Sequence, residues 1–248
     1  MRQRLGRQLL KTLSAANEGT LLSSLRTGLG DLQLALCFHR VGPERDKLCM
    51  PSAEIDRLIA FCLEARGELT VSFDDGYQSA ADYLLSRAQR WPQIEWLYFV
   101  CPQKTEQRAE PELAEIERCL EIGRLPNASL GNHTNTHRRL SLLSPDDVLE
   151  ELSSSQRDFE RLFGPQLHFA VPFGVPGVDF SADHVDELRS LGEFFIWSTE
   201  PRPFHPRERR AGSVLPRFAV DGRRRWKETA VHIALHALRT RVLGDGRF

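Results

Sequence analysis

The sequence of 248 residues contains no apolar run that approaches the roughly 18 residues of a membrane-spanning helix. It has five cysteines, an odd number, and no Cys-x-x-Cys pair, so neither a secreted disulfide framework nor a cysteine-ligated zinc site is expected. Low-complexity tracts, internal repeats and a linker that would divide the body are also missing. With 41% hydrophobic and 27% charged residues, the composition is that of an ordinary soluble protein, which excludes a collagen or a disordered chain.

The amino-terminal segment lacks the long apolar core of a secretory signal. It begins with basic residues, but its longest apolar runs are two residues. Together with the cysteine usage, this predicts a reducing, cytoplasmic setting.

The formal charge of −1 conceals an uneven distribution along the chain. Residues 1–30 carry a balance of +4 and residues 201–248 a balance of +8, so residues 31–200 carry −13. Basic ends suit contact with an anionic surface such as a membrane, although solvated arginines would give the same pattern. No nucleic-acid reading motif accompanies the arginine-rich stretch 202–225, so nucleic acid is not expected as a partner.

Strand and helix patterns alternate over most of the chain, which predicts an α/β fold with a parallel sheet, open or closed into a barrel. The strand patterns cover 32–39, 68–73, 95–100, 128–131, 168–172 and 193–197, and the helical patterns cover the first thirty residues, 53–66, 78–90, 111–122, 144–163, 181–191 and 224–243.

The first thirty residues have leucines at helical spacing with basic residues between them. Such a helix can lie on an anionic membrane, or it can pack its leucines on the body of the protein, and both alternatives stay open. We expect a basic helical segment over 1–30 and one domain with a basic C-terminal helix over 31–248. The leucines are Leu5, Leu9, Leu10 and Leu13.

Two adjacent carboxylates, Asp74 and Asp75, end one expected strand within the segment SFDDGY. Side chains at strand ends face the functional edge of a parallel α/β sheet, so one carboxylate can bind a metal while its neighbour acts as a base. Asp-Gly pairs also mark ordinary turns, and that interpretation is open for this segment alone.

Two histidines follow, His133 and His137, in the segment HTNTH. At a spacing of four they would share one face of a helical turn and could ligate one metal ion, although this spacing alone is weak evidence. The segment FAVPFG, residues 169–174, has the pattern of a strand end that turns sharply.

Together, these three segments resemble the polysaccharide deacetylases, the NodB-homology group of carbohydrate esterase family four, over residues 32–220. The resemblance implies a distorted (β/α) barrel. It also implies hydrolysis of N-acetyl, and in some members O-acetyl, groups on sugars with a divalent metal, most often zinc.

Carried over by the resemblance, Asp75, His133 and His137 bind the metal, leaving an open position for water. Asp74 is the general base on that water. The metal and the backbone N–H of Tyr77 stabilise the oxyanion that forms, and a general acid protonates the leaving nitrogen.

The sequence departs from the common family pattern in the third segment. Many members carry an arginine that orients the base two residues before the proline, and here that residue is Ala170. A subgroup that acts on exopolysaccharides has a hydrophobic-Pro-aromatic-Gly version, which this segment matches. That subgroup also has a strand ending in Tyr-His and a later Leu-Pro-Arg, similar to Phe38-His39 and 215–217 here. The resemblance therefore implies His39 as the acid and Arg217 as the cation beside the base.

Three further residues complete the expected site. His236 is the alternative acid, because its segment Ile233-Ala234-Leu235-His236 is similar to the Leu-x-His motif of other members, but its basic helical context is typical of a surface histidine. Pro172 is expected at the substrate. Trp197 is expected to line the acetyl pocket, or else to be a core tryptophan.

The predicted function is that of a metal-dependent carbohydrate deacetylase, a hydrolase of linear amides. Its substrate would be an N-acetylated sugar in a bacterial-type surface glycan, such as an exopolysaccharide or lipopolysaccharide, or in its cytoplasmic, lipid-linked precursor. The basic termini would then contact the inner membrane face. A metal-dependent amidohydrolase on a non-sugar amide and a catalytically degenerate glycan-binding barrel are the alternatives.

Overall fold

The computed structural model describes residues 12–243. Of the leucines expected to form an amino-terminal stripe, Leu5, Leu9 and Leu10 lie outside the described residues, whereas Leu13 is buried in the main core.

Ten strands form an eight-stranded sheet and a separate two-stranded one. The strands are β1 (Ala35–Phe38), β2 (Arg40–Val41), β3 (Cys49–Met50), β4 (Leu69–Phe73), β5 (Ile94–Val100), β6 (Ala128–Asn132), β7 (His168–Ala170), β8 (Phe195–Trp197), β9 (Val214–Leu215) and β10 (Phe218–Ala219).

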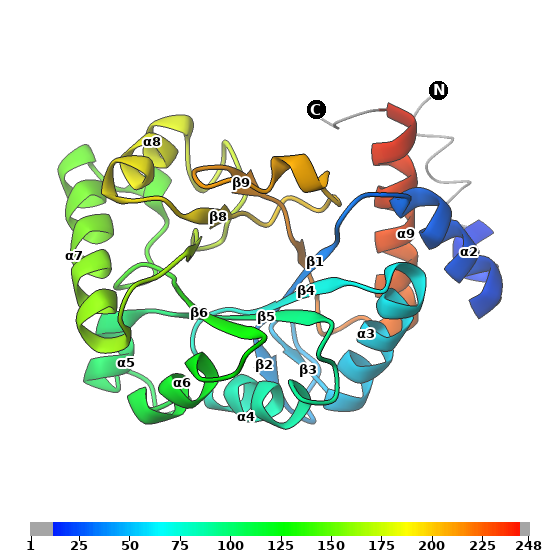
Figure 1. Ribbon diagram of the computed structural model, residues 1–248, viewed down its shortest axis with the longest axis horizontal. Coiled ribbons are helices and arrows are strands. Elements are labelled where there is room, and N and C mark those ends of the chain that lie inside the picture. Colours follow the sequence, from blue (N-terminus) through cyan, green and yellow to red (C-terminus); the bar gives the residue numbers. More distant parts are fainter. Residues whose placement is uncertain (1–11, 244–248) are drawn as a thin grey trace.

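The large sheet is parallel throughout and has the order β10-β1-β4-β5-β6-β7-β8-β9. It curls into a half-barrel with helices around its outside (Figure 1). Every residue of β1 and β4 is buried, as parallel strands covered on both faces require. The edge strands β9 and β10 are consecutive in the chain but not hydrogen-bonded to each other, so the barrel is distorted and open there, and the expected fold is confirmed.

Helices cover the sheet and connect its strands. They are α2 (Glu18–Leu29), α3 (Ser52–Arg66), α4 (Gln78–Arg87), α5 (Pro102–Gln107), α6 (Ile116–Gly123), α7 (Pro145–Phe163), α8 (Ala182–Leu191) and α9 (Trp226–Leu243), with short 3-10 turns η1 (Leu140–Leu142) and η2 (Pro206–Glu208). No helix within residues 12–243 has an apolar stretch long enough to cross a bilayer.

The start of α7 follows local sequence rules. Ser144 caps the helix by accepting a hydrogen bond from the backbone N–H of Asp147 at 3.2 Å, and Pro145 occupies the first turn. This predicted start is confirmed.

The helix expected over 111–122 begins five residues late, at Ile116. The residues before Ile116 instead pair with the loop that follows β4. Leu113 forms an isolated bridge with Tyr77, and the N–H of Ala114 donates to the carbonyl of Gly76 at 2.9 Å. This long-range pairing determines the local conformation, which the helical pattern alone does not foresee.

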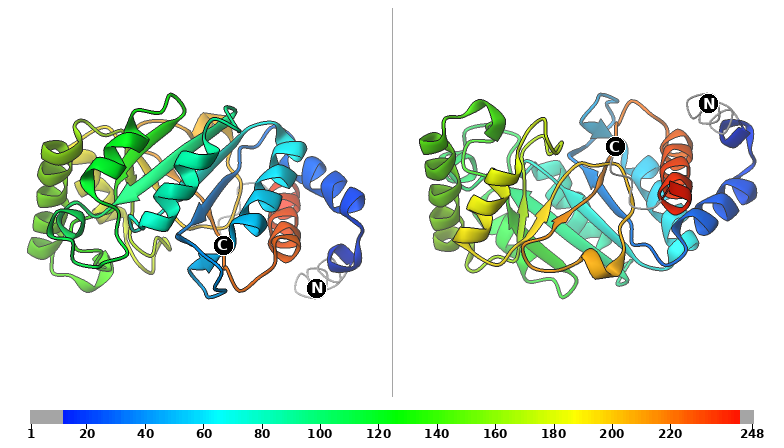
Figure 2. Two further views of the ribbon diagram at one scale, coloured as in Figure 1. Left: turned by 90° about the horizontal axis from the view of Figure 1, so that it is seen from below. Right: turned by 90° about the horizontal axis from the view of Figure 1, so that it is seen from above.

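Helices α2 and α9, from opposite ends of the chain, lie side by side on the outside of the barrel (Figures 1 and 2). The buried leucines of α2, such as Leu25, belong to the same core as Ala234 of α9. Their closest approach is at Gly28, where an added Cβ would lie 2.7 Å from the backbone nitrogen of Leu238. The division into a 1–30 segment and a 31–248 domain stays a prediction.

The Gly28→Ala variant should destabilise the protein by about 1–3 kcal/mol, because its methyl group has no space against the α9 backbone. Gly19→Ala in the same helix is the matched control, since the nearest side-chain atom to its added Cβ is 3.6 Å away. That control should gain about 0.5–1 kcal/mol from helix propensity. Urea denaturation of both variants measures the difference, and equal stabilities would contradict close packing of α2 on α9.

Candidate active site

The carboxyl ends of the central strands align at one edge of the sheet. The register pairs Phe38 with Phe73, Phe73 with Tyr98, and Val100 with Asn132. Each strand therefore delivers its following residues to the same edge: His39 after β1, the two aspartates after β4 and His133 after β6.

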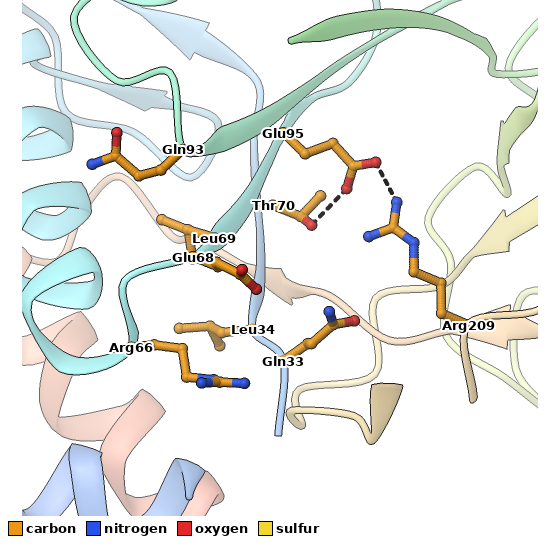
Figure 3. A pocket seen from close by; sticks show the side chains of 9 residues that line it. All are labelled: Gln33, Leu34, Arg66, Glu68, Leu69, Thr70, Gln93, Glu95 and Arg209. Carbon is orange, nitrogen blue, oxygen red and sulfur yellow. Dashed lines mark hydrogen bonds and ion pairs between the residues drawn. The ribbon is translucent and has the colours of Figure 1, made fainter. Parts of the chain in front are cut away.

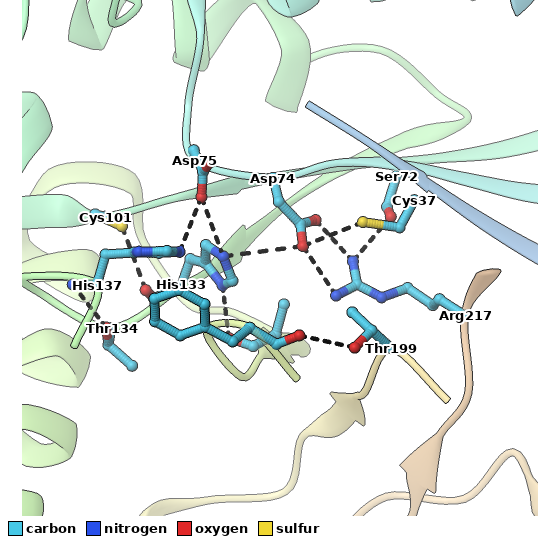
Figure 4. Close-up of polar contacts among 12 residues, drawn as sticks. Cys37, Ser72, Asp74, Asp75, Cys101, His133, Thr134, His137, Thr199 and Arg217 are labelled. Carbon is cyan, nitrogen blue, oxygen red and sulfur yellow. Dashed lines mark hydrogen bonds and ion pairs between the residues drawn. The ribbon is translucent and has the colours of Figure 1, made fainter. Parts of the chain in front are cut away.

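Asp75, His133 and His137 converge on one point (Figure 4). The Nε2 atoms of His137 and His133 lie 3.0 and 3.4 Å from the same oxygen, Oδ1 of Asp75. That oxygen is buried and has no partner with hydrogen-bond geometry among the described residues. His133 donates from Nδ1 to the carbonyl of Ala170 at 2.8 Å, which leaves its Nε2 lone pair directed at Asp75.

These donors fit a divalent metal such as zinc, because two imidazoles and one carboxylate are a common catalytic ligand set. Burial raises the pKa of Asp75, but the two facing imidazoles lower it far below its ordinary value. The carboxylate is therefore ionised, as a metal ligand must be. The side chains of Asp75 and His137 are 15% and 23% exposed, so the centre is open to solvent on that side.

The backbone is strained around these ligands. Asp75, Thr134, His137 and Phe173 have φ values of 71°, 61°, 60° and 61°, in the left-handed region that non-glycine residues rarely adopt. Only Arg108 shares this property elsewhere in the described chain. The expectation that His133 and His137 lie on a helical turn is therefore wrong: the segment is a loop, and positive φ at Thr134 and His137 excludes a right-handed helix.

Helix α7 holds this histidine loop from behind. Glu151, only 2% exposed, accepts hydrogen bonds from the backbone N–H of Thr136 at 2.7 Å and from its hydroxyl at 2.8 Å. Asn135 donates to Ser154 and Asp158 on the same helix. Glu151 belongs to none of the three motif segments, although a glutamate on the apolar face of an amphipathic helix was a signal that could have identified it.

Asp74 lies beside the triad, and Arg217 grips it from the other side. The guanidinium donates to both oxygens of Asp74, at 2.7 and 3.0 Å, and both side chains are almost fully buried. Arg217 also donates to the hydroxyl of Ser72 at 2.8 Å and to the carbonyl of Ser198 at 3.1 Å. Burial raises the pKa of Asp74, but Arg217 outweighs it with help from His133, so the pKa lies below its ordinary value.

The two candidate acids differ in their surroundings. His39 lies next to Asp74, and its buried Nδ1 has no hydrogen-bond partner among residues 12–243. Burial lowers the pKa of His39, against the raising effect of Asp75 and Asp74. His236 packs its ring on Phe218 at 5.7 Å, and burial lowers its pKa to about 4. The charged neighbours of His236 do not include the two aspartates.

Tyr77 follows the aspartates and caps α4. Its carbonyl accepts a hydrogen bond from the Tyr98 hydroxyl at 2.9 Å, while its backbone N–H has no acceptor in the described part of the chain. That N–H is free for a substrate oxygen.

Pro172 is buried at the turn after β7, directly before Phe173, whose ring lies 5.1 Å from that of His137. Trp197 is completely buried in a cluster with Phe99 and Ala170, and its indole N–H donates to His168 at 3.1 Å. Phe99 and Ala170 both contact His133, so the cluster that contains Trp197 packs against this histidine.

A polar pocket of about 230 Å³ lies at the opposite edge of the sheet, where β4 and β5 begin (Figure 3). Arg209 forms an ion pair there with Glu95, which also accepts from the Thr70 hydroxyl at 2.8 Å. The His and Asp side chains that could hold a metal converge at the carboxyl edge instead.

Comparison with known proteins identifies the family of the chain. The family model of polysaccharide deacetylases matches residues 64–194, more than half of the chain. The chain therefore belongs to the polysaccharide deacetylase family, and the expected family and enzyme class, a carbohydrate deacetylase, are confirmed. A search of curated proteins finds no match to the sequence.

Solved structures share the fold at low sequence identity. A polysaccharide deacetylase from Bacillus cereus is 18% identical, with a TM-score of 0.65 over 82% of this chain and 69% of its own. IcaB from Ammonifex degensii is 20% identical, with a TM-score of 0.63 over 84% and 98%. The deacetylase PplD from Streptococcus pyogenes, solved with acetate, is 14% identical, with a TM-score of 0.62 over 79% and 96%.

The Glu151→Gln variant should bind zinc about tenfold more weakly, because loss of one acceptor oxygen loosens the loop that carries both histidines. Glu150→Gln is the matched control, since Glu150 is exposed and its one ion pair within residues 12–243 is with Arg157. Competition with a chromophoric chelator measures both affinities. Equal affinities would show that α7 does not support the metal ligands.

Proposed function

We propose that this protein removes N-acetyl groups from a sugar of a bacterial-type surface glycan or of its lipid-linked precursor, using a divalent metal, most simply zinc. The observation that carries this proposal is the position of Asp74 beside the three converging donors. Its Oδ2 lies 3.8 Å from Nε2 of His133, close enough to act on the same reacting atoms.

Asp75, His133 and His137 would hold the metal, which when bound supplies Lewis-acid polarisation of the acetyl carbonyl and acidifies a water molecule. Asp74 then accepts the proton of the attacking water. Arg217 keeps Asp74 ionised and oriented, in place of the arginine that many members carry where Ala170 stands.

The free backbone N–H of Tyr77 would donate to the carbonyl oxygen as negative charge develops there. His39 would donate a proton to the leaving sugar nitrogen, since an amide anion is a poor leaving group. The proximity of His39 to Asp74 favours it over His236, whose neighbours are Arg239 and His232. Pro172 and Trp197 would shape the acetyl side of the site.

The basic ends support a further part of the proposal, peripheral contact with an anionic membrane that carries the substrate. Arg224, Arg225 and Lys227 line a cavity of about 450 Å³ and form no ion pair within residues 12–243. The pKa of His232 in the same cavity is lowered, first by burial and then by Arg224, although Glu228 opposes this effect. The five free, buried cysteines are consistent with a reducing compartment, which we propose is the cytoplasm.

Purified protein with zinc should release acetate from N-acetylhexosamine-containing glycans or glycolipids, and Asp74→Asn should lower kcat by about 10²–10⁴-fold through loss of the base. Asp82→Asn on the exposed face of α4 is the control and should leave kcat unchanged. Acetate release is measured by an enzyme-coupled assay. Faster hydrolysis of small non-sugar amides would support an amidohydrolase, and binding of glycan without acetate release would indicate a degenerate barrel.

Substrates with different leaving groups distinguish the general acid from the other catalytic residues. His39→Ala should abolish most hydrolysis of the sugar amide but retain hydrolysis of an aryl acetate, because a phenolate leaves without protonation. His236→Ala should retain both activities. Parallel losses on the two substrates in His39→Ala would remove His39 as the acid.

Arg224→Gln combined with Arg225→Gln should weaken binding to vesicles rich in phosphatidylglycerol about thirtyfold, since each charge contributes about 1 kcal/mol near an anionic surface. Arg207→Gln with Arg210→Gln removes the same charge beside η2 and should have little effect. Vesicle sedimentation at low and high salt measures the affinity, and added salt should weaken it. Equal losses in the two double variants would indicate only a general charge effect.

A further inference from the structure

Cys37 is completely buried in β1 and lies beside the carboxylate of Asp74 (Figure 4). Its Sγ is 3.4 Å from Oδ2 of Asp74, within hydrogen-bond distance for a thiol. This is the same oxygen that faces His133, and it also accepts from Arg217, whereas the one hydrogen bond of Oδ1 to a described residue is from Arg217.

Two other groups are in reach of the thiol: the carbonyl of Phe38 at 3.9 Å and the hydroxyl of Ser72, which already accepts from Arg217. That carbonyl already accepts from the backbone N–H of Asp74 at 3.0 Å. A carboxylate is also the stronger acceptor, so the S–H points to Asp74. Burial and the neighbouring Asp74 raise the pKa of Cys37 well above its ordinary value, so the sulfur keeps its proton and can donate.

The other hydrogen bonds of Asp74 indicate what this thiol contributes. Arg217 donates one hydrogen bond to each oxygen of Asp74. The thiol is a second donor to Oδ2, the oxygen that lies 3.8 Å from Nε2 of His133, and a second donor restricts rotation of the carboxylate further. Cys37 comes from the neighbouring strand, where the register pairs it with Ser72, two residues before Asp74.

We infer that Cys37 is a positioning residue, whose thiol holds Oδ2 of Asp74 in the orientation required for proton transfer. It has this role only if Asp74 is the base of the proposed reaction. The sequence pattern does not distinguish Cys37 from the other four cysteines, and residue 37 lies outside the three motif segments.

Kinetics of Cys37→Ala and Cys37→Ser test this inference. Loss of one hydrogen bond to the base should lower kcat of Cys37→Ala about fivefold with KM unchanged. Cys37→Ser retains a donor and should recover most of that loss.

Cys62 provides the matched pair of controls. It is equally buried, burial alone raises its pKa to about 12, and its thiol has no hydrogen bond to another described residue. Cys62→Ala and Cys62→Ser should leave kcat unchanged, or should lower it without any recovery by serine. If Cys37→Ala has the kcat of the wild type, or if serine fails to recover it, the inference is wrong.

Infrared spectroscopy tests the hydrogen bond without any activity. Difference spectra between the wild type and each alanine variant isolate the S–H stretching bands of Cys37 and Cys62. The Cys37 band should lie at lower frequency, because a thiol that donates to a carboxylate has a weakened S–H bond. Equal frequencies would overturn the inference. If the Cys37 band is lowered but the protein releases no acetate, the hydrogen bond is supported and the proposed function is refuted.

Discussion

The buried ion pair between Arg217 and Asp74 is the interaction on which both the barrel and its site depend. Arg217 lies in the connection between the two edge strands, β9 and β10, which do not pair with each other. Its guanidinium reaches Asp74 after β4 and the carbonyl of Ser198 after β8. A fully buried charge is tolerated only with such partners, and loss of one partner from a buried pair costs about 3–5 kcal/mol. The barrel opening and the orientation of Asp74 are therefore maintained by the same side chain.

Rigid loops extend this constraint to the rest of the site. Asp75 and His137, which we propose as metal ligands, have backbone conformations that are unfavourable for non-glycine residues. These conformations persist because surrounding groups determine them, above all Glu151 of α7 behind the histidine loop. The result is a preorganised centre in which ligands and base have fixed directions before substrate binds. Such a centre tolerates few changes in the helix that supports it.

The uneven charge distribution along the chain corresponds to separate regions of the folded protein. Helices α2 and α9 come from the two basic ends of the chain and meet side by side outside the barrel (Figure 2). The acidic middle supplies the aspartates of the site: Asp75 faces two imidazoles, and Asp74 pairs with Arg217 from the basic end. The cavity at the start of α9 concentrates positive charge that no described acid neutralises by an ion pair. The catalytic and cationic regions are thus separate features of one molecule.

The sequence by itself determined the class of fold, the family and the residues that converge at the carboxyl edge. These depend on short-range patterns: buried strand runs, and polar residues directly after them such as Asp74 and His133. The short strands β9 and β10, the non-helical histidine loop and the partners of Asp74 depended on the tertiary structure. Arg217 is 143 positions from Asp74, and Cys37 acts from another strand. Only the sheet register and the curl of the barrel bring such distant side chains together, because a hydrogen bond depends on distance in space rather than along the chain.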